Sequence, residues 1–184
     1  TTGLRKLSDM NVELYFIHGN RDFLLGEKYA HRCGMKILSE VEVINLYDQQ
    51  IIIMHGDTLC TLDVDYQAFR KKSRSWWWQG IIKSLPLFVR RKIAENYREK
   101  SAEATNQKSQ EIMDVTPGEV VNCFNKHNAR ILIHGHTHRP ATHDLMVGNE
   151  PAQRIVLGDW YEQGSILKVQ AKKIELINKQ FSDD

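Results

Sequence analysis

The sequence predicts an α/β fold, a layered β-sandwich flanked by helices, and three observations support this prediction. Short apolar runs recur along the 184 residues, and several of them end abruptly in polar loops. Segments with helical spacing and helix-capping residues separate some of these runs. Other runs follow one another across turn-forming residues, as in β-hairpins. Strand-helix units mixed with hairpins predict a layered α/β sandwich rather than a purely parallel sheet.

The first half of the chain predicts a strand, a helix and a hairpin in turn. Residues 12–18 form an apolar run that ends at a Gly-Asn turn signal, so we expect a strand there. Residues 21–34 carry apolar residues four apart and end in a glycine suited to a helix C-cap, which predicts a helix. Residues 41–46 and 50–54 are apolar runs separated by three residues, which predicts a hairpin.

Residues 66–109 predict a mostly helical segment that is strongly basic. A break is expected at Leu85-Pro86, because proline disfavours the helical conformation in the residue before it. Residues 70–100, here named the basic segment, hold ten basic and two acidic residues, so they carry +8 while the rest of the chain carries −6. The triplet Trp76-Trp77-Trp78 lies within it. Basic charge beside large apolar side chains suits a nucleic acid or an anionic membrane surface.

The last third predicts one helix and four strands. Thr116, Pro117 and Glu119 form a strong helix start, with an N-cap, a proline at the first helical position and an acid three residues after the cap. This helix is expected to run to about His127. The expected strands are short apolar runs over residues 130–133, 154–157, 165–169 and 174–177.

Composition fits one globular domain and excludes several classes of protein. With 41% apolar and 26% charged residues, the chain is neither disordered nor collagen-like. Charged residues interrupt every apolar run well before the roughly 20 residues that a membrane helix needs, and we expect no secretory signal. The three cysteines lack CxxC spacing, which argues against a disulfide framework or a zinc ribbon and favours a reducing, cytoplasmic location.

Three polar loops that directly follow predicted strands carry the candidate chemistry. They are Gly19-Asn20-Arg21-Asp22, His55-Gly56-Asp57 and Gly135-His136-Thr137-His138. Groups beyond the carboxyl ends of neighbouring strands converge on one crevice, so we expect these loops to meet. Imidazole nitrogens and an amide oxygen suit divalent metals such as Mn²⁺, Fe²⁺ or Zn²⁺. Asp22 and Asp57 are expected to orient ligands or cap helices rather than to bind metal directly.

These motifs resemble those of the calcineurin-like metallophosphoesterases. GNRD, HGD and GHTH occur in the order of that family's later motifs, and the stretches YFIHGNRDFLLG, IIIMHGDTLCTLDVDYQAFR, ILIHGHTHRPA and VLGDW resemble its lipid A branch. The resemblance implies metal-dependent water attack at the α-phosphorus of UDP-2,3-diacylglucosamine, giving UMP and 2,3-diacylglucosamine 1-phosphate. It also implies two Mn²⁺ ions and one domain over residues 1–184, in which residues 64–112 form an inserted helical lid.

The resemblance also implies roles for individual residues. The implied metal ligands are Asn20, His55, His136 and His138, and the implied catalytic residues are Arg21 and His136. The implied substrate contacts are Asn20, Arg21, Asp63, Ser101, Thr105, Lys108 and His136, with Tyr66 and Asn106 as weaker additions. For the acyl chains of such a substrate, the candidates for apolar walls, or for insertion into the membrane interface, are Trp76, Trp77, Trp78, Leu85, Phe88 and Ile93.

One departure from the family pattern affects the metal sites. The sequence holds neither the D-x-H motif nor the GD motif that precedes GN, which in the family supply most of the first metal site and the bridging carboxylate. Asn20, His55 and His136 would then supply most of the second site, and His138 would be the remaining ligand of the first. We expect the chain to be the C-terminal part of a longer enzyme, without its N-terminal strand-helix-strand unit, and to bind metal weakly by itself.

The expected partners are UDP-2,3-diacylglucosamine and an anionic membrane surface, with neither a nucleic acid nor an obligate protein partner. The expected location is the cytoplasmic face of the inner membrane, as a peripheral protein. Two alternatives stay open at this stage. One is a metallophosphoesterase that acts on another phosphodiester or nucleotide, and the other is a non-catalytic scaffold of the same fold.

Overall fold

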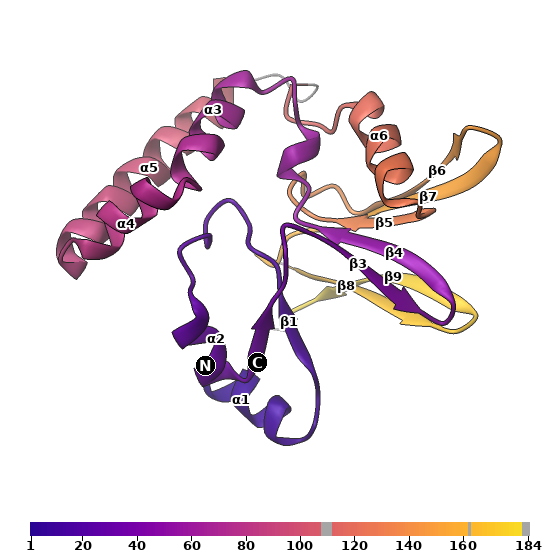
Figure 1. Ribbon diagram of the computed structural model, residues 1–184, viewed down its shortest axis with the longest axis horizontal. Helices are drawn as coiled ribbons and strands as arrows, with labels where there is room; N and C mark the ends of the chain where they lie inside the picture. Colours follow the sequence, from indigo (N-terminus) through magenta and orange to yellow (C-terminus); the bar gives the residue numbers. More distant parts are fainter. Residues whose placement is uncertain (108–111, 162, 182–184) are drawn as a thin grey trace. The chain divides into compact units, whose positions relative to one another are not determined.

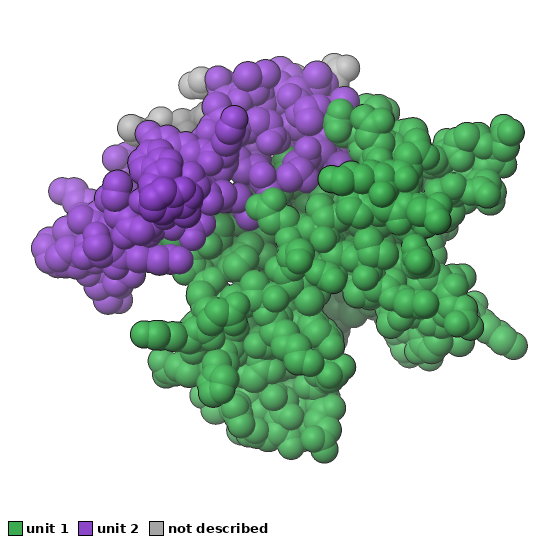
Figure 2. Space-filling view, in the orientation of Figure 1, with its two compact units in different colours: residues 1–57, 117–184 green, residues 58–116 purple. Residues whose placement is uncertain are grey.

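The computed structural model describes residues 1–107, 112–161 and 163–181. The chain divides into two compact units, coloured separately in Figure 2. Unit 1 comprises Thr1–Asp57 and Pro117–Asp184, and unit 2 comprises Thr58–Thr116.

The centre of unit 1 is a five-stranded mixed sheet of order β3-β4-β5-β7-β6 (Figure 1). Its strands are β3 (Val41–Leu46), β4 (Gln49–Met54), β5 (Ile131–His134), β6 (Ala141–Val147) and β7 (Glu150–Val156). The three inner strands β4, β5 and β7 are parallel, whereas β3 and β6 pair antiparallel at the two edges. Parallel strands end at the same edge of a sheet, so the loops after β4, β5 and β7 share one edge.

Two further strand pairs complete unit 1. β1 (Leu14–Phe16) pairs parallel with β2 (Met35–Ile37), and β8 (Gln163–Gln170) pairs antiparallel with β9 (Lys173–Gln180). Buried isoleucines of the central strands pack against Leu167, Val169 and Ile174 of the β8–β9 pair. Ile51 and Ile52, which point to opposite faces of β4, are both fully buried. The central sheet is therefore covered on both faces, as expected for a layered sandwich.

The helices of unit 1 are α1 (Thr2–Asp9), α2 (Glu27–Cys33) and α6 (Pro117–His127). Gly34 ends α2 with φ of 73°, a left-handed conformation that glycine adopts without steric cost. Helix α6 has the predicted bounds and buries Val120 and Phe124. Local capping signals therefore placed both of these helix ends correctly.

Unit 2 is helical within its described residues. The short 3₁₀ turn η1 (Asp57–Leu59) leads into α3 (Val64–Ser73), α4 (Trp76–Ser84) and α5 (Leu87–Gln107). Asp63 caps α3, since its Oδ1 accepts a hydrogen bond of 3.1 Å from the Tyr66 backbone N–H. The predicted break at Leu85-Pro86 separates α4 from α5. Unit 2 contains the predicted range 64–112, and its action as a lid stays a prediction.

The α/β class is confirmed, but several elements differ from the prediction. The strand expected over 12–18 is limited to β1. The helix expected from residue 21 begins only at Glu27, because Asp22 instead accepts backbone hydrogen bonds from Gly19 and Leu25 in a turn. Helix α1 and strands β2 and β6 were not predicted. β6 lies at an edge and exposes polar side chains such as Asp144, so it shows no continuous apolar run.

Within residues 1–107, 112–161 and 163–181, no helix combines the length and the apolar character that crossing a membrane requires.

Candidate active site

Two of the three predicted loops meet at the carboxyl edge of β4 and β5. Met54 and His134 are partners in the parallel register, so His55 and Gly135 come next to each other beyond the strands. The Gly135 backbone N–H donates a hydrogen bond of 3.0 Å to the His55 carbonyl oxygen. The ring centroids of His55 and His136 are 4.9 Å apart, with planes inclined by 62°. Strand pairing therefore brings together imidazoles that are 81 positions apart in the chain.

The third loop, which follows β1, reaches the same place through Gly19. A Cβ atom built on Gly19 would lie 2.9 Å from Nε2 of His55, closer than real Cβ contacts. The Gly19 backbone N–H donates to Asp22 Oδ1 at 2.5 Å, so Asp22 shapes this loop. Asn20 directly follows Gly19. The absence of a side chain at Gly19 thus lets the Gly-Asn loop lie against the His55 ring.

His55 also faces a buried carboxylate. Its Nδ1 lies 3.4 Å from Oδ1 of Asp57, whose side chain is 3% exposed. A carboxylate beside one ring nitrogen orients an imidazole and leaves the other nitrogen available to a metal. Within the described residues, however, His55 Nδ1 makes no hydrogen bond, so the orienting role predicted for Asp57 stays a prediction.

His136 is neutral at neutral pH. Burial lowers the pKa of its imidazole from 6.5 to about 4, and the neighbouring His55 lowers the pKa further, while Asp57 opposes the shift. A neutral imidazole keeps a nitrogen lone pair that can bind a divalent cation or accept a proton. His136 therefore has the protonation state that either predicted role requires.

The backbone of the GHTH loop is strained at both histidines. His136 has φ of 68° and His138 has φ of 54°, which lie in the left-handed region that residues with a Cβ rarely adopt. Such conformations cost on the order of 1 to 3 kcal/mol each and cluster at functional sites. Backbone hydrogen bonds from Thr137 to Gly135 (2.8 Å) and from Leu157 to His134 (2.7 Å) hold the loop.

His134, unlike His55 and His136, has a structural role. It is buried, and its Nε2 lies 3.1 Å from Nη1 of Arg154. A guanidinium only donates, so Nε2 accepts and the proton lies on Nδ1, which is 2.9 Å from the Gly135 carbonyl oxygen. Both ring nitrogens are thereby engaged within the protein.

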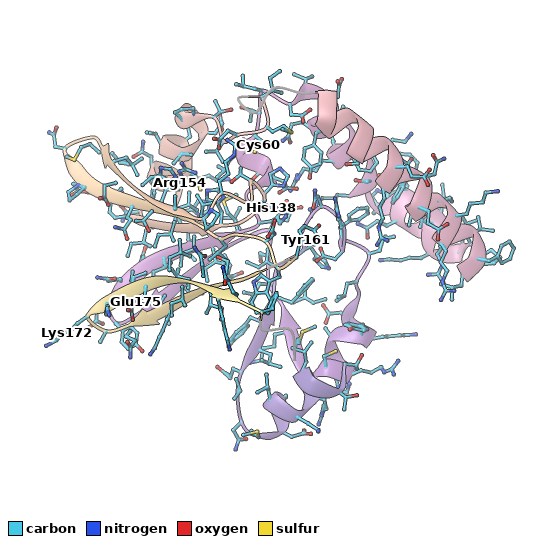
Figure 3. The ribbon with its side chains drawn as sticks, turned by 180° about the vertical axis from the view of Figure 1, so that it is seen from behind. Cys60, His138, Arg154, Tyr161, Lys172 and Glu175 are labelled. Atoms are coloured by element: carbon cyan, nitrogen blue, oxygen red, sulfur yellow. The ribbon has the colours of Figure 1, made fainter. Side chains whose placement is uncertain are left out.

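Two residues that the sequence analysis did not assign lie beside the predicted ones. Asp159 Oδ2 is 3.4 Å from His138 Nδ1, and the Tyr161 hydroxyl accepts a hydrogen bond of 3.1 Å from Arg21 Nη1. The rings of His138 and Tyr161, both labelled in Figure 3, are 6.2 Å apart. Both new residues follow β7, the parallel neighbour of β5. Polar residues directly after an apolar strand were the sequence signal for the other three loops. The same signal is present here, since Asp159 and Tyr161 follow the apolar run over residues 154–157.

The remaining predicted substrate residues lie in unit 2. Asp63 caps α3, and Ser101 is exposed on α5. Thr105 and Asn106 also lie on α5, but their side chains are not described, and Lys108 lies outside the described residues. Their role as substrate contacts stays a prediction.

The candidate site holds only part of the donor set that the predicted metal needs. In the described part of the chain, no group of three or more His, Cys, Asp or Glu side chains could hold a metal ion. Two neighbouring imidazoles, one of them neutral, and the asparagine that follows Gly19 in the chain are nevertheless donors of the type that first-row divalent metals take. The residues present therefore fit part of a metal site.

A cavity of about 1000 Å³ in unit 1 is separate from these residues. It is lined by residues at the starts of β4 and β5, such as Gln49 and Ile131, and by Lys172 in the β8–β9 turn. Lys172 is seen in Figure 3 far from His138 and Tyr161. The candidate active site lies at the other end of the parallel strands.

Comparison with known protein families shows which family the chain belongs to. The family described as calcineurin-like phosphoesterase matches residues 2–140. The chain belongs to this family. A calcineurin-like phosphoesterase is a hydrolytic enzyme that uses divalent metal ions, so the prediction of a metal-dependent enzyme is confirmed at that level.

This phosphoesterase is also similar to named enzymes over nearly its whole length. It is 52% identical to the UDP-2,3-diacylglucosamine hydrolase of Escherichia coli O127:H6, over 97% of this chain and 74% of the relative. It is 51% identical, with the same coverage, to the enzymes of the same name from Escherichia fergusonii and Escherichia coli K12. The predicted resemblance to the lipid A branch is therefore confirmed.

Proposed function

We propose that this protein hydrolyses the pyrophosphate bond of UDP-2,3-diacylglucosamine, by water attack at the α-phosphorus, to UMP and 2,3-diacylglucosamine 1-phosphate. The names of its close relatives support this substrate. The structural observation that carries the proposal is the meeting of His55, His136 and the Gly19-Asn20 loop at one edge of the sheet. Three segments distant in sequence meet there, and they carry donors of the kind that a hydrolytic metal site uses.

We propose that the complete enzyme binds two divalent metal ions and that these ions are Mn²⁺. This chain would supply part of their ligands. Asn20, His55 and His136 supply ligands for one ion, and His138 supplies a ligand for the other. When bound, such ions supply Lewis-acid activation of water and positive charge near the phosphoryl oxygens. We assign the orientation of His55 to the Asp57 carboxylate, 3.4 Å from Nδ1, and the low pKa of His136 supports an unprotonated imidazole.

Arg21 is the residue that grips the diphosphate. A guanidinium stays charged and binds phosphate oxygens with two parallel N–H groups. One of its five N–H groups is engaged by the Tyr161 hydroxyl, which leaves the others for a ligand. We also assign to His136 a contact with a phosphate oxygen, through the ring N–H that a neutral imidazole keeps.

Unit 2 provides the apolar surface that a diacylated substrate needs. Trp76 is 86% exposed and Phe88 is 74% exposed, whereas Trp78 packs against Tyr97 with ring centroids 6.5 Å apart. Within the tryptophan triplet, Trp78 therefore packs inside unit 2, whereas Trp76 is exposed to solvent. We assign the exposed members to the acyl chains or to an anionic membrane surface, with the protein peripheral on the cytoplasmic face of the inner membrane. Asp63, Ser101, Thr105 and Lys108 are assigned to the glucosamine and phosphate groups.

Phosphorus NMR with the protein encoded by the complete gene tests this function. Incubation with UDP-2,3-diacylglucosamine and Mn²⁺ is expected to release UMP, and His136→Ala is expected to abolish the release. His31→Ala, which changes an exposed histidine of α2, is the matched control and is expected to retain activity. No UMP above the metal-free blank would contradict the proposal.

A phosphodiesterase for soluble nucleotides is the second candidate, because the +8 charge of the basic segment also suits such substrates. The same assay with a UDP-sugar that lacks acyl chains separates the two. The lipid proposal predicts far slower release of UMP from that compound, and equal rates would favour the second candidate.

A further inference from the structure

We propose that Asp159 and Tyr161, in the loop after β7, are positioning residues that hold His138 and Arg21 at the active site. The proposal deepens the proposed function and rests on it. Neither residue belongs to the GNRD, HGD or GHTH motifs, and each contacts a different member of the predicted site.

Tyr161 restrains Arg21 without neutralising it. An arginine side chain is flexible, and holding it in one geometry removes much of the entropy cost of binding phosphate. Arg21 donates from Nη1 to the Tyr161 hydroxyl, 140 positions away. Within the described residues its guanidinium makes no ion pair with the nearby Asp22 or Glu27. A neutral acceptor fixes the guanidinium and leaves its full charge for the diphosphate.

Asp159 lies beside His138 as Asp57 lies beside His55, and we assign it the role of orienting the ring. Both carboxylates lie 3.4 Å from the Nδ1 atom of their histidine. In each pair a carboxylate faces Nδ1, so Nε2 is the ring nitrogen on the side away from the carboxylate that can bind a metal. His138 is the more exposed ring, with 48% of its side chain accessible, and its backbone is left-handed. It therefore depends on Asp159, and on the neighbouring Tyr161 ring, for a defined orientation.

The loop that carries both residues is anchored on two strands. Its start is tied to β5 by the Leu157 N–H bond to His134. Its middle is tied to Ser165 of β8, whose Oγ accepts from the Gly158 N–H at 2.8 Å and whose carbonyl accepts from Trp160 Nε1 at 3.0 Å. Ser165, which accepts both hydrogen bonds, is buried. A loop held in this way can impose positions on Arg21 and His138.

The first test measures coupling between Tyr161 and Arg21. Tyr161→Phe removes the hydroxyl and keeps the ring, and we expect kcat/KM for the lipid substrate to fall about tenfold, as for loss of a hydrogen bond to a charged group. In an Arg21→Ala background the same change is expected to have no further effect, because there is nothing left to position. Multiplicative losses in the double variant would overturn the proposal for Tyr161. Tyr15→Phe, whose hydroxyl bonds Glu13, is the matched control and should leave kcat/KM unchanged.

The second test measures metal binding without substrate. In the protein encoded by the complete gene, Asp159→Asn is expected to lower the Mn²⁺ affinity found by calorimetry roughly 10- to 100-fold. Asp144→Asn, which changes an exposed aspartate of β6, should leave the affinity unchanged. Unchanged affinity in a folded Asp159→Asn variant would overturn the proposal for Asp159. Because this titration uses the metal alone, it stays readable if UDP-2,3-diacylglucosamine proves to be the wrong substrate.

Discussion

At the scale of single residues, the lack of space beside the His55 ring requires glycine at position 19. The His55 ring is 19% exposed and is flanked by the His136 ring, so it has little freedom to move away from an added methyl group. We predict that Gly19→Ala displaces the ring and lowers Mn²⁺ affinity at least about tenfold, as for loss of a ligand-orienting contact. Calorimetric titration of the complete gene product would measure this.

Gly118→Ala is the matched control for that change. A Cβ at Gly118, in α6, would meet no atom within 4 Å. Alanine is favoured over glycine in helices by up to about 1 kcal/mol, so this variant should be slightly more stable and bind Mn²⁺ normally. Equal losses of affinity in the two variants would argue against a specific role for Gly19.

His136 gives the metal-free protein a defined dependence of stability on pH. Its folded pKa of about 4 lies below the unfolded value of 6.5, so between these values the unfolded state binds more protons. We predict that the free energy of unfolding falls as the pH is lowered through this range. Urea denaturation at several pH values would measure the slope, and His136→Gln should reduce it. A slope unchanged by the substitution would contradict the low pKa.

At the scale of elements, the parallel strands β4 and β5 support the site because they are buried on both faces. Ile51 is fully buried in the core cluster, whereas Ile166 of β8 is 41% exposed. We predict that Ile51→Ala lowers the free energy of unfolding by about 2 to 5 kcal/mol and Ile166→Ala by about 1 kcal/mol or less. Denaturant titration of both variants checks the difference. Similar losses would show that the sheet is not the structural support of the loops.

At the scale of the whole molecule, the uneven distribution of charge predicts how the protein meets a membrane. The basic segment carries +8 while the remainder carries −6, and Trp76 and Phe88 are exposed within it. We predict binding to vesicles that contain phosphatidylglycerol and weak binding to pure phosphatidylcholine. The binding should weaken with salt, because the Debye length shortens from about 10 Å at 0.1 M to about 3 Å at 1 M.

Cosedimentation with these vesicles measures the prediction. Trp76→Ser combined with Phe88→Ser should reduce binding at every salt concentration, since apolar insertion is lost. Met146→Ser, which changes an exposed apolar residue of unit 1, is the control and should bind as the parent protein does. Equal binding to neutral and anionic vesicles would contradict the electrostatic part.

By itself the sequence determined the features that depend on a few neighbouring residues. Gly34 and Pro117 marked helix ends, Leu85-Pro86 marked the break between α4 and α5, and apolar runs marked the inner strands. These signals are local because capping, proline geometry and burial of a short strand are decided within a few positions. The candidate residues His55 and His136 were found in the same way, as polar groups directly after buried strands.

Only the tertiary structure decided which distant residues touch. The edge strand β6 was not predicted because its exposed polar side chains interrupt the apolar run. The turn at Asp22 replaces the start of a predicted helix. The contacts of Tyr161 with Arg21 and of Asp159 with His138 depend on strand order in the sheet. Contacts between residues so far apart form through chain folding, and no local pattern of residues encodes the pairing.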